Sequence, residues 1–215
     1  PLVDYCVAEI GLTKSAKHGD IELIIDDYLE AEEHRLIVSE EGVAIRGGDY
    51  GGLFNGVMTL LQLLPANVYN GGLTGSAEVV CCEISDSPRY EHRGFMLDVC
   101  RTWMNKEAVM DFIDLLAYHK INSLRLHLTD DEAWRLEIKS HPELAEVGGF
   151  RGGDSPLHPI HGSFDQKHGG YYTQEELRDI VAYAAERNIE VIPEIDMPGN
   201  SKALGVVHPD ILCNY

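Results

Sequence analysis

The stretch VIPEIDMPGN, residues 191–200, decides which fold this chain is expected to adopt. Val191 and Ile192 are β-branched residues, typical of a strand that is buried on both faces. Glu194 and Asp196 then place two carboxylates on the same side of the strand, because side chains alternate along it. A Pro-Gly pair turns the chain directly afterwards. We therefore expect a buried strand whose charged residues are confined to its carboxyl end.

Two earlier segments follow the same plan. GFMLDVCR (94–101) and NSLRLHLTDD (122–131) are apolar at first and become charged toward their carboxyl ends. The polar residues at the three strand ends are Asp98, Arg101, His127, Asp130, Asp131, Glu194 and Asp196.

Two amphipathic helices separate these strands. The first is predicted over 105–120 with Asn105 as its N-cap. The second is predicted over 173–188 and opens with a capping box of Thr173 and Glu176. This β-α-β-α-β order predicts three adjacent parallel strands in chain order, covered on one face by both helices.

The position of the charges favours a TIM barrel over a doubly wound sheet. In a TIM barrel the carboxyl ends of the strands form the active-site face. A doubly wound nucleotide-binding domain would have a Gly-rich turn after its first strand, and RTWMNK (101–106) has none. The predicted fold class is therefore α/β, with the first three βα units of a TIM (β/α)8 barrel after a small α+β domain.

The small domain is predicted over residues 1–84 and the partial barrel over 85–215, because Ser, Asp and Pro cluster around the boundary. The first domain should contain a strand at 21–26, a hairpin at 34–47 that turns near Glu41-Gly42, and a helix at 51–65. We assign no functional site to it.

Composition excludes some partners. The chain has 215 residues, with 36 acidic against 17 basic ones and a formal net charge of −19. Such a charge argues against nucleic acid or an anionic membrane as partner. No apolar run reaches the roughly 18–20 residues of a membrane span. The five cysteines are odd in number and lack zinc-type spacing, so buried or free thiols are expected.

The strand-end residues have competing interpretations. An alternative role for Asp130 and Asp131 is to cap the turn that follows the strand. Arg101 is expected to pair with a carboxylate, Asp98 or Glu194, and a guanidinium held in that way is suited to gripping vicinal hydroxyls. The acids and His127 would also suit Mg²⁺ or Mn²⁺, although no His-x-His or His-Glu-x-x-His spacing supports a metal. A metal-dependent barrel enzyme is thus the weaker hypothesis.

Four segments resemble family 20 glycoside hydrolases, the β-N-acetylhexosaminidases, especially their bacterial forms. RGFMLDVCRTWM (93–104), INSLRLHLTDDEAWRLEI (121–138) and VIPEIDMPGN (191–200) are similar to the first three barrel strands of that family. HRLIVSEEGVAIRGGDYGGLFNGVMTLLQLL (34–64) is similar to the small domain that precedes the barrel. The resemblance covers roughly residues 20–215.

The resemblance implies a retaining exo-glycosidase that removes terminal β-linked GlcNAc or GalNAc, with no cofactor. Its mechanism would be substrate-assisted, with the acetamido oxygen of the substrate attacking its own anomeric carbon. Arg101 would bind the 3- and 4-hydroxyls of the sugar, together with Asp130. The supporting residues would be Asp98, His127, Asp131, Glu194, Asp196 and Asn200.

Two departures from the family stand out. The catalytic Asp-Glu pair, in a Gly-Gly-Asp-Glu context at the end of strand four, is absent from residues 1–215. We therefore expect a fragment that is inactive alone. In addition, Asn200 occupies the place of a His that links the strand-two Asp to a further acid. We expect Asn200 to orient Asp130 by hydrogen bonding.

Further expectations concern partners and location. The bacterial resemblance implies a periplasmic, extracellular or surface protein and a glycan ligand with a terminal N-acetylhexosamine. An incomplete barrel leaves strand edges unpaired and an apolar face uncovered, so we expect self-association through Met96, Leu126 or Ile192. A non-catalytic glycan-binding module is the alternative from another functional class.

Overall fold

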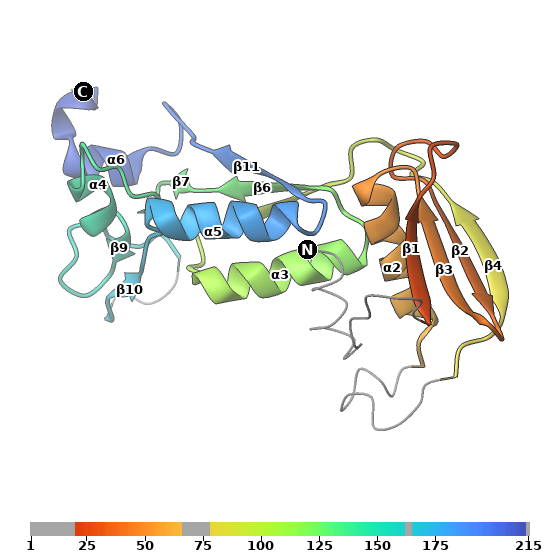
Figure 1. Ribbon diagram of the computed structural model, residues 1–215. Helices are drawn as coiled ribbons and strands as arrows, with labels where there is room; N and C mark the ends of the chain where they lie inside the picture. Colours follow the sequence, from red (N-terminus) through yellow and green to blue (C-terminus); the bar gives the residue numbers. More distant parts are fainter. Residues whose placement is uncertain (1–19, 66–77, 162–164, 214–215) are drawn as a thin grey trace. The chain divides into compact units, whose positions relative to one another are not determined.

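The computed structural model describes residues 20–65, 78–161 and 165–213, and the chain divides into two compact units (Figure 1). The first unit reaches to Arg93 and also includes Ala117–Lys120 and Glu186–Asn188. The second unit contains the remaining residues up to the carboxyl end. Strand β4 (Cys82–Asp86) runs across the domain boundary that we predict after residue 84.

The first unit is built on a four-stranded sheet with the order β1-β3-β2-β4. β2 (His34–Ser39) and β3 (Gly42–Gly47) form the predicted antiparallel hairpin. β1 (Ile21–Ile25) pairs with β3 in parallel, and β4 pairs with β2 in antiparallel fashion. Strand β4 was not predicted from the sequence, because its alternating pattern is short and lies beside the Ser-Asp-Pro cluster.

Helix α2 (Tyr50–Leu63) packs on this sheet, close to its predicted bounds. Asp49 caps its first turn by accepting a hydrogen bond from the backbone amide of Gly52 at 2.7 Å. Apolar residues of the helix and of the two central strands form the core: Leu36, Ile45, Phe54, Val57 and Met58 are all almost fully buried.

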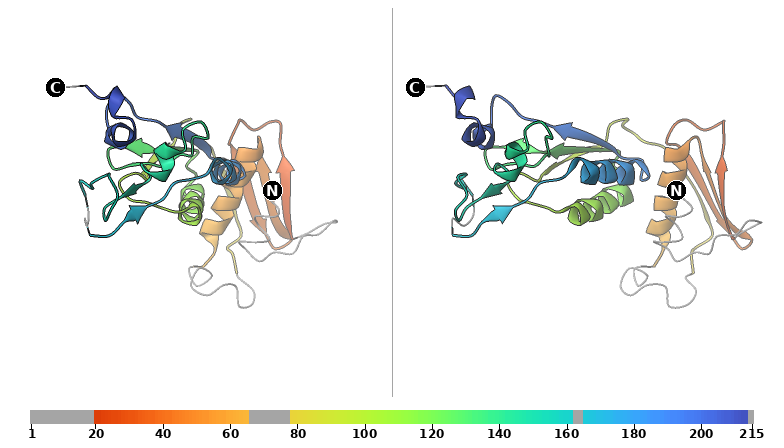
Figure 2. Two further views of the ribbon diagram at one scale, coloured as in Figure 1. Left: turned by 90° about the vertical axis from the view of Figure 1, so that its left-hand side faces the viewer. Right: turned by 60° about the vertical axis from the view of Figure 1, so that its left-hand side comes forward.

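The second unit contains the three predicted parallel strands. They are β5 (Gly94–Asp98), β6 (Ser123–His127) and β11 (Glu190–Glu194), in the order β11-β6-β5. Helices α3 (Lys106–Tyr118) and α5 (Gln174–Ala185) lie along one face of the sheet (Figures 1 and 2). The predicted strand order and helix placement are confirmed. Within residues 94–161 and 165–213 the sheet stays open and forms no closed barrel.

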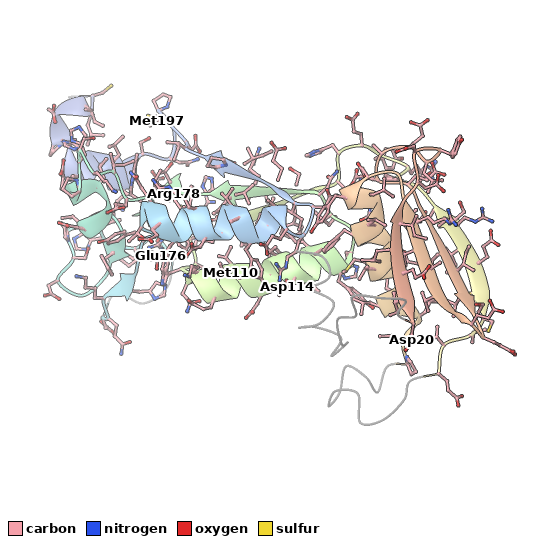
Figure 3. The ribbon with its side chains drawn as sticks, in the orientation of Figure 1. Asp20, Met110, Asp114, Glu176, Arg178 and Met197 are labelled. Carbon is pink, nitrogen blue, oxygen red and sulfur yellow. The ribbon has the colours of Figure 1, made fainter. Side chains whose placement is uncertain are left out.

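Both predicted helix starts are confirmed. The Asn105 side chain accepts a hydrogen bond from the amide of Ala108, and Thr173 and Glu176 cap each other reciprocally (Figure 3 labels Glu176). The helices end before the predicted bounds, because Lys120 and Asn188 adopt positive φ values of 57° and 59°. This left-handed conformation stops a helix.

Short elements follow the strands of the second unit. β7 (Thr129–Asp130) pairs with β8 (Ala133–Trp134), and β9 (Phe150–Arg151) pairs with β10 (His168–Gly169). Helices α4 (Glu143–Glu146) and α6 (Lys202–Val207) contact each other, and the 3-10 helix η2 (Pro209–Ile211) follows α6. A cluster of Trp134, Leu144 and Ala145 anchors this region.

The register of the sheet separates two faces. Met96, Arg125 and Ile192 are direct partners across the strands, and therefore project from the same face. Met96 and Ile192 are 45% and 38% exposed. Leu126 projects from the opposite face and is fully buried, so our expectation that it takes part in self-association is wrong. Self-association through Met96 and Ile192 stays a prediction.

Two further sequence expectations concern the membrane and the cysteines. Within the ranges described, every helix is too short or too polar to cross a bilayer. Cys100 is buried as a free thiol, Cys82 is half-buried, and Cys81 and Cys213 are exposed free thiols. Cys6 lies outside the described residues.

Candidate active site

Three polar residues form one row across the carboxyl ends of the parallel strands. Asp98 of β5 and Glu194 of β11 are both direct register partners of His127 in β6. Because the strands are in register, all three side chains project from the face opposite the helices. The sequence predicted each of these residues at a strand end, and the structure brings them together.

His127 is the centre of this row and is 5% exposed. Its Nδ1 lies 2.9 Å from Oε1 of Glu194, and its Nε2 lies 2.9 Å from Oδ2 of Asp130. Burial lowers the pKa of His127, but the hydrogen bonds to Asp130 and Glu194, together with the negative charges of Asp98 and Glu194, raise it above its usual value. A carboxylate only accepts hydrogen bonds, so two such partners favour the imidazolium, in which both nitrogens donate.

We expect the free energy of unfolding of the second unit to fall as the pH rises through the folded pKa of His127. The folded pKa lies above the ordinary 6.5, so the stabilisation is complete below that value and is lost at higher pH. Both tryptophans, Trp103 and Trp134, lie in the second unit, so their fluorescence during urea unfolding follows that unit. The variant His127→Gln should lose this pH dependence, and His92→Gln, an exposed histidine, should keep it. Equal pH dependence in wild type and His127→Gln would contradict the assignment.

Arg101 is held between two carboxylates. Its Nη1 lies 2.6 Å from Oδ2 of Asp98, and its Nη2 lies 2.8 Å from Oδ2 of Asp130. The other oxygen of Asp98 accepts the backbone amides of Cys100 and Arg101, which turns the chain where β5 ends. The Arg101 side chain remains 45% exposed, whereas the Asp130 side chain is 2% exposed. The guanidinium is thus oriented by one buried and one half-buried acid while it still faces solvent.

The remaining predicted residues hold the loop after β11. Oδ1 of Asp131 accepts the backbone amide of Lys202 at 2.9 Å, at the start of α6. The backbone amide of Asp196 donates to Oγ1 of Thr129 at 2.8 Å. Met197, 54% exposed, lies in the same loop (Figure 3).

We expected the Asn200 side chain to hydrogen-bond Asp130, but it bonds Asp196 instead. Its Nδ2 donates to Oδ2 of Asp196 at 2.7 Å. The bridge from the strand-two acid to a further acid is instead made by His127, which joins Asp130 to Glu194. Asn200 also adopts a φ of 49°, a left-handed conformation that asparagine tolerates better than most residues.

Arg135 is a residue that the sequence analysis missed. Its side chain is fully buried and donates to four backbone carbonyls, at 2.6–2.8 Å. Its guanidinium also lies over the ring of Trp103, 5.1 Å from the centroid. The four acceptors are Val99, Cys100, Gly149 and Gly170. Burial lowers the pKa of Arg135 to about 10, so the group stays charged near neutral pH. It ties the loop after β5 to the loops around β9 and β10.

A buried ion pair of Glu132 and Arg151 also lies beneath Arg101 and was missed. Arg151 donates to the backbone carbonyl of Arg101 at 2.7 Å, and its Nη1 lies 2.8 Å from Oε2 of Glu132. The other oxygen of Glu132 accepts the amides of Ile160 and His161. The only sequence signal for this pair was the run of charges in TDDEAWR.

The aromatic residues near the strand ends mainly pack. Tyr172 is 1% exposed and its hydroxyl donates to the carbonyl of Met104, while burial raises its pKa. Its ring lies 4.8 Å from that of Trp103, centroid to centroid. Trp134 belongs to a buried cluster. Trp103 is therefore the aromatic side chain closest to Arg101 in sequence that keeps partial exposure.

A divalent metal fits this site poorly. Asp98, Cys100 and His127 have potential ligand atoms close together, but burial raises the pKa of Cys100, which disfavours the thiolate that a metal binds. The three acids are already paired with cations: Asp98 and Asp130 with Arg101, and Glu194 with Arg125 at 2.5 Å. Positive partners occupy the carboxylate oxygens that Mg²⁺ or Mn²⁺ would need.

Profiles of known protein families match nearly the whole chain. Residues 90–215 match the profile of the glycosyl hydrolase family 20 catalytic domain, and residues 7–87 match that of domain 2 of the same family. The chain belongs to glycosyl hydrolase family 20. Its α/β structure agrees with the family resemblance seen in the sequence.

Known members of family 20 are similar over most of this chain. A β-hexosaminidase of Vibrio furnissii is 42% identical over 86% of the chain, which is 29% of that protein. A β-hexosaminidase of Porphyromonas gingivalis is 44% identical over 86% of the chain and 23% of its own length. The crystal structure of an exo-β-N-acetylglucosaminidase of Vibrio harveyi with N-acetylglucosamine superposes with a TM-score of 0.89 at 40% identity, over 99% of this chain and 33% of that one. The chain thus spans about a quarter to a third of these relatives.

Proposed function

We propose that the chain is part of a β-N-acetylhexosaminidase, and that the complete protein removes terminal β-linked GlcNAc or GalNAc by a retaining, substrate-assisted mechanism. Named β-hexosaminidases at 42% and 44% identity support the proposal. The observation that carries it is the half-exposed Arg101 guanidinium, held between Asp98 and Asp130 at the carboxyl ends of parallel strands.

In this proposal Arg101 binds the 3- and 4-hydroxyls of the terminal sugar. A planar guanidinium presents donors in a fixed orientation, and vicinal hydroxyls are spaced to accept them. Asp130 contributes to the same subsite, and its charge is balanced by Arg101 and His127. Asp98, Asp131, Glu194, Asp196 and Asn200 orient these groups or the loops that carry them.

Fold and location belong to the same proposal. Strands β5, β6 and β11 would be the first three of eight barrel strands, within a partial catalytic domain of residues 85–215, after a small domain of residues 1–84. The two family profiles divide the chain at nearly this point, between residues 87 and 90. The similarity to bacterial relatives favours a periplasmic, extracellular or surface protein.

The test is hydrolysis of an aryl β-N-acetylglucosaminide by the complete protein and by residues 1–215 alone. We expect turnover by the complete protein and none above background by the chain, which contains no Gly-Gly-Asp-Glu segment. General acid–base catalysis by such a group contributes about 10²–10⁴-fold. Turnover by the chain that is lost on Arg101→Ala would show that another acid acts. An inactive complete protein that still binds N-acetylglucosamine would favour a glycan-binding module.

Substitution of Asn200 separates its side-chain role from its backbone role. In the complete protein, we expect Asn200→Gly to lower kcat by about 10-fold, the lower end of the range for supporting residues, because Asp196 loses its amide donor. Asn200→Ala should lose more, since alanine also resists a φ of 49°. Asn200→His should change kcat little, because His127 already bridges the two acids. A gain of several hundred-fold for Asn200→His would contradict this assignment.

A further inference from the structure

Two histidines and one glutamate converge on the surface of the second unit, outside the strand-end site. Nδ1 of His141 lies 3.1 Å from Oε1 of Glu143, and Nε2 of His208 lies 3.2 Å from the same oxygen. The three potential ligand atoms all lie within 4.8 Å of one another. The histidine rings are 5.6 Å apart and nearly perpendicular, at 86°. One side of the cluster faces solvent, because the His141 side chain is 57% exposed.

The two nitrogen-to-oxygen separations are close to those of a zinc coordination shell. Zn²⁺ binds imidazole nitrogen at about 2.0–2.1 Å and carboxylate oxygen at about 2.0–2.2 Å, in tetrahedral geometry. Two such ligands around one ion are then about 3.3–3.5 Å apart. The two nitrogen-to-oxygen distances of 3.1 and 3.2 Å need only a small outward shift to reach this value.

Packing against a buried apolar cluster fixes the positions of the three proposed ligand residues. His141 and Glu143 flank Pro142 at the start of α4, and Leu144 follows them into the buried cluster with Trp134 and Ala145. His208 comes directly after α6, whose residues Leu204 and Val207 pack against the same cluster. The amide of His208 also donates to the carbonyl of Leu204 at 2.9 Å. The two segments are 65 or more residues apart in the sequence. Both pack on the same apolar cluster, which holds their ligand atoms close together.

We propose that His141, Glu143 and His208 form a binding site for a divalent transition-metal ion, with Zn²⁺ as the preferred ion. Two imidazoles and a carboxylate suit this class of metal, whereas Ca²⁺ and Mg²⁺ prefer oxygen ligands alone. Three protein ligands leave the fourth position to water. The ion joins the start of α4 to the end of α6, and so stabilises the segment that follows the loop of Asp196 and Asn200.

The test is titration of the untagged 215-residue chain with Zn²⁺ in a calorimeter, and with Co²⁺ in a spectrometer. We expect one high-affinity Zn²⁺ per chain and a higher thermal midpoint in its presence, because an ion that binds only the folded state stabilises it. Bound Co²⁺ should give visible ligand-field bands without the intense near-ultraviolet charge-transfer band of thiolate ligands. That spectrum distinguishes this site from binding by the exposed Cys81 and Cys213.

Three variants and one control identify the ligands. His141→Ala, Glu143→Ala and His208→Ala should each weaken Zn²⁺ binding by about 10-fold or more, since loss of even a supporting residue costs that much. His158→Ala, an exposed histidine of the same unit, should bind Zn²⁺ like the wild type. Affinity and stoichiometry that are unchanged in the three variants, or wild-type chain that binds no Zn²⁺, would overturn the proposal. Because the readout is binding, failure here is distinct from failure of the proposed hexosaminidase activity.

Discussion

Replacing Arg101 by alanine in the complete protein is expected to lower kcat/KM for an aryl β-N-acetylglucosaminide by about 10²–10³-fold. Two losses contribute to this effect. Under the proposed function the sugar would lose its hydrogen bonds from the guanidinium, and a site built to bind a hydroxyl discriminates strongly when that bond is missing. Asp130, with its side chain 2% exposed, also loses one of its two positive partners, which leaves a buried carboxylate with less compensating charge. Arg101→Lys should recover little of the lost kcat/KM, because an ammonium group cannot donate the paired hydrogen bonds of a planar guanidinium.

A substrate without its 4-hydroxyl tests the role of Arg101 directly. The wild-type enzyme should lose most of its kcat/KM on this analogue, whereas Arg101→Ala should lose little more than it already has. The matched control is Arg46→Ala, which removes an arginine paired with Asp26 in the other unit and should leave the activity unchanged. Equal losses of wild type and Arg101→Ala on the deoxy analogue would show that Arg101 does not bind that hydroxyl.

Replacing Arg135 by methionine is expected to lower the free energy of unfolding of the second unit by about 4 kcal/mol or more. Four backbone carbonyls would lose their charged donor, and a hydrogen bond to a charged group contributes about 1.5–3 kcal/mol. Two of the four keep a second donor: the Cys100 carbonyl keeps Arg151, and the Gly149 carbonyl keeps the amide of Gly170. Methionine has nearly the length of the arginine stem, so the packing volume changes little compared with the loss of hydrogen bonds. Since domains are stable by only about 5–15 kcal/mol, this loss would be a large share of the second unit's stability.

The measurement is urea unfolding of the 215-residue chain followed by tryptophan fluorescence. Arg125→Met is the matched control, because Arg125 has a 54% exposed side chain that forms an ion pair with Glu194. An exposed ion pair contributes about 0–1 kcal/mol, so the control should unfold near the wild-type midpoint. If Arg135→Met and Arg125→Met unfolded at the same urea concentration, the hydrogen bonds of Arg135 would not be what holds the three loops together.

Much of the fold was predictable because its signals are local. The helix starts at Asn105 and Thr173 follow from side chains within three residues of the amides that they cap. Parallel pairing of β5, β6 and β11 follows from the chain order of strands and helices, which permits few topologies. The ends of the strands were recognisable because charged residues interrupt apolar runs there. These features depend on neighbours in sequence, and a sequence contains them in full.

The tertiary structure alone decided which polar groups meet. Asp98, His127 and Glu194 form a row because of the register of the sheet, and a slip of one residue would have turned His127 to the helix face. For the same reason Leu126 is buried, while Met96, which we named with it for self-association, is 45% exposed. Register depends on packing between strands that lie about 30 to 70 residues apart, which no local pattern encodes.

The supports of the site were also decided by long-range contacts. Arg135 bonds carbonyls that lie 14 to 36 residues away, and Arg151 reaches the carbonyl of Arg101 across 50 residues. Asn200 looked suited to Asp130 in the sequence, but in the structure its side-chain amide donates to Asp196. The sequence by itself thus determined the family, the three parallel strands and their charged ends. The tertiary structure decided which groups those charges contact. A buried polar group without a hydrogen bond costs free energy, so each one pairs with whatever partner the folded chain places beside it.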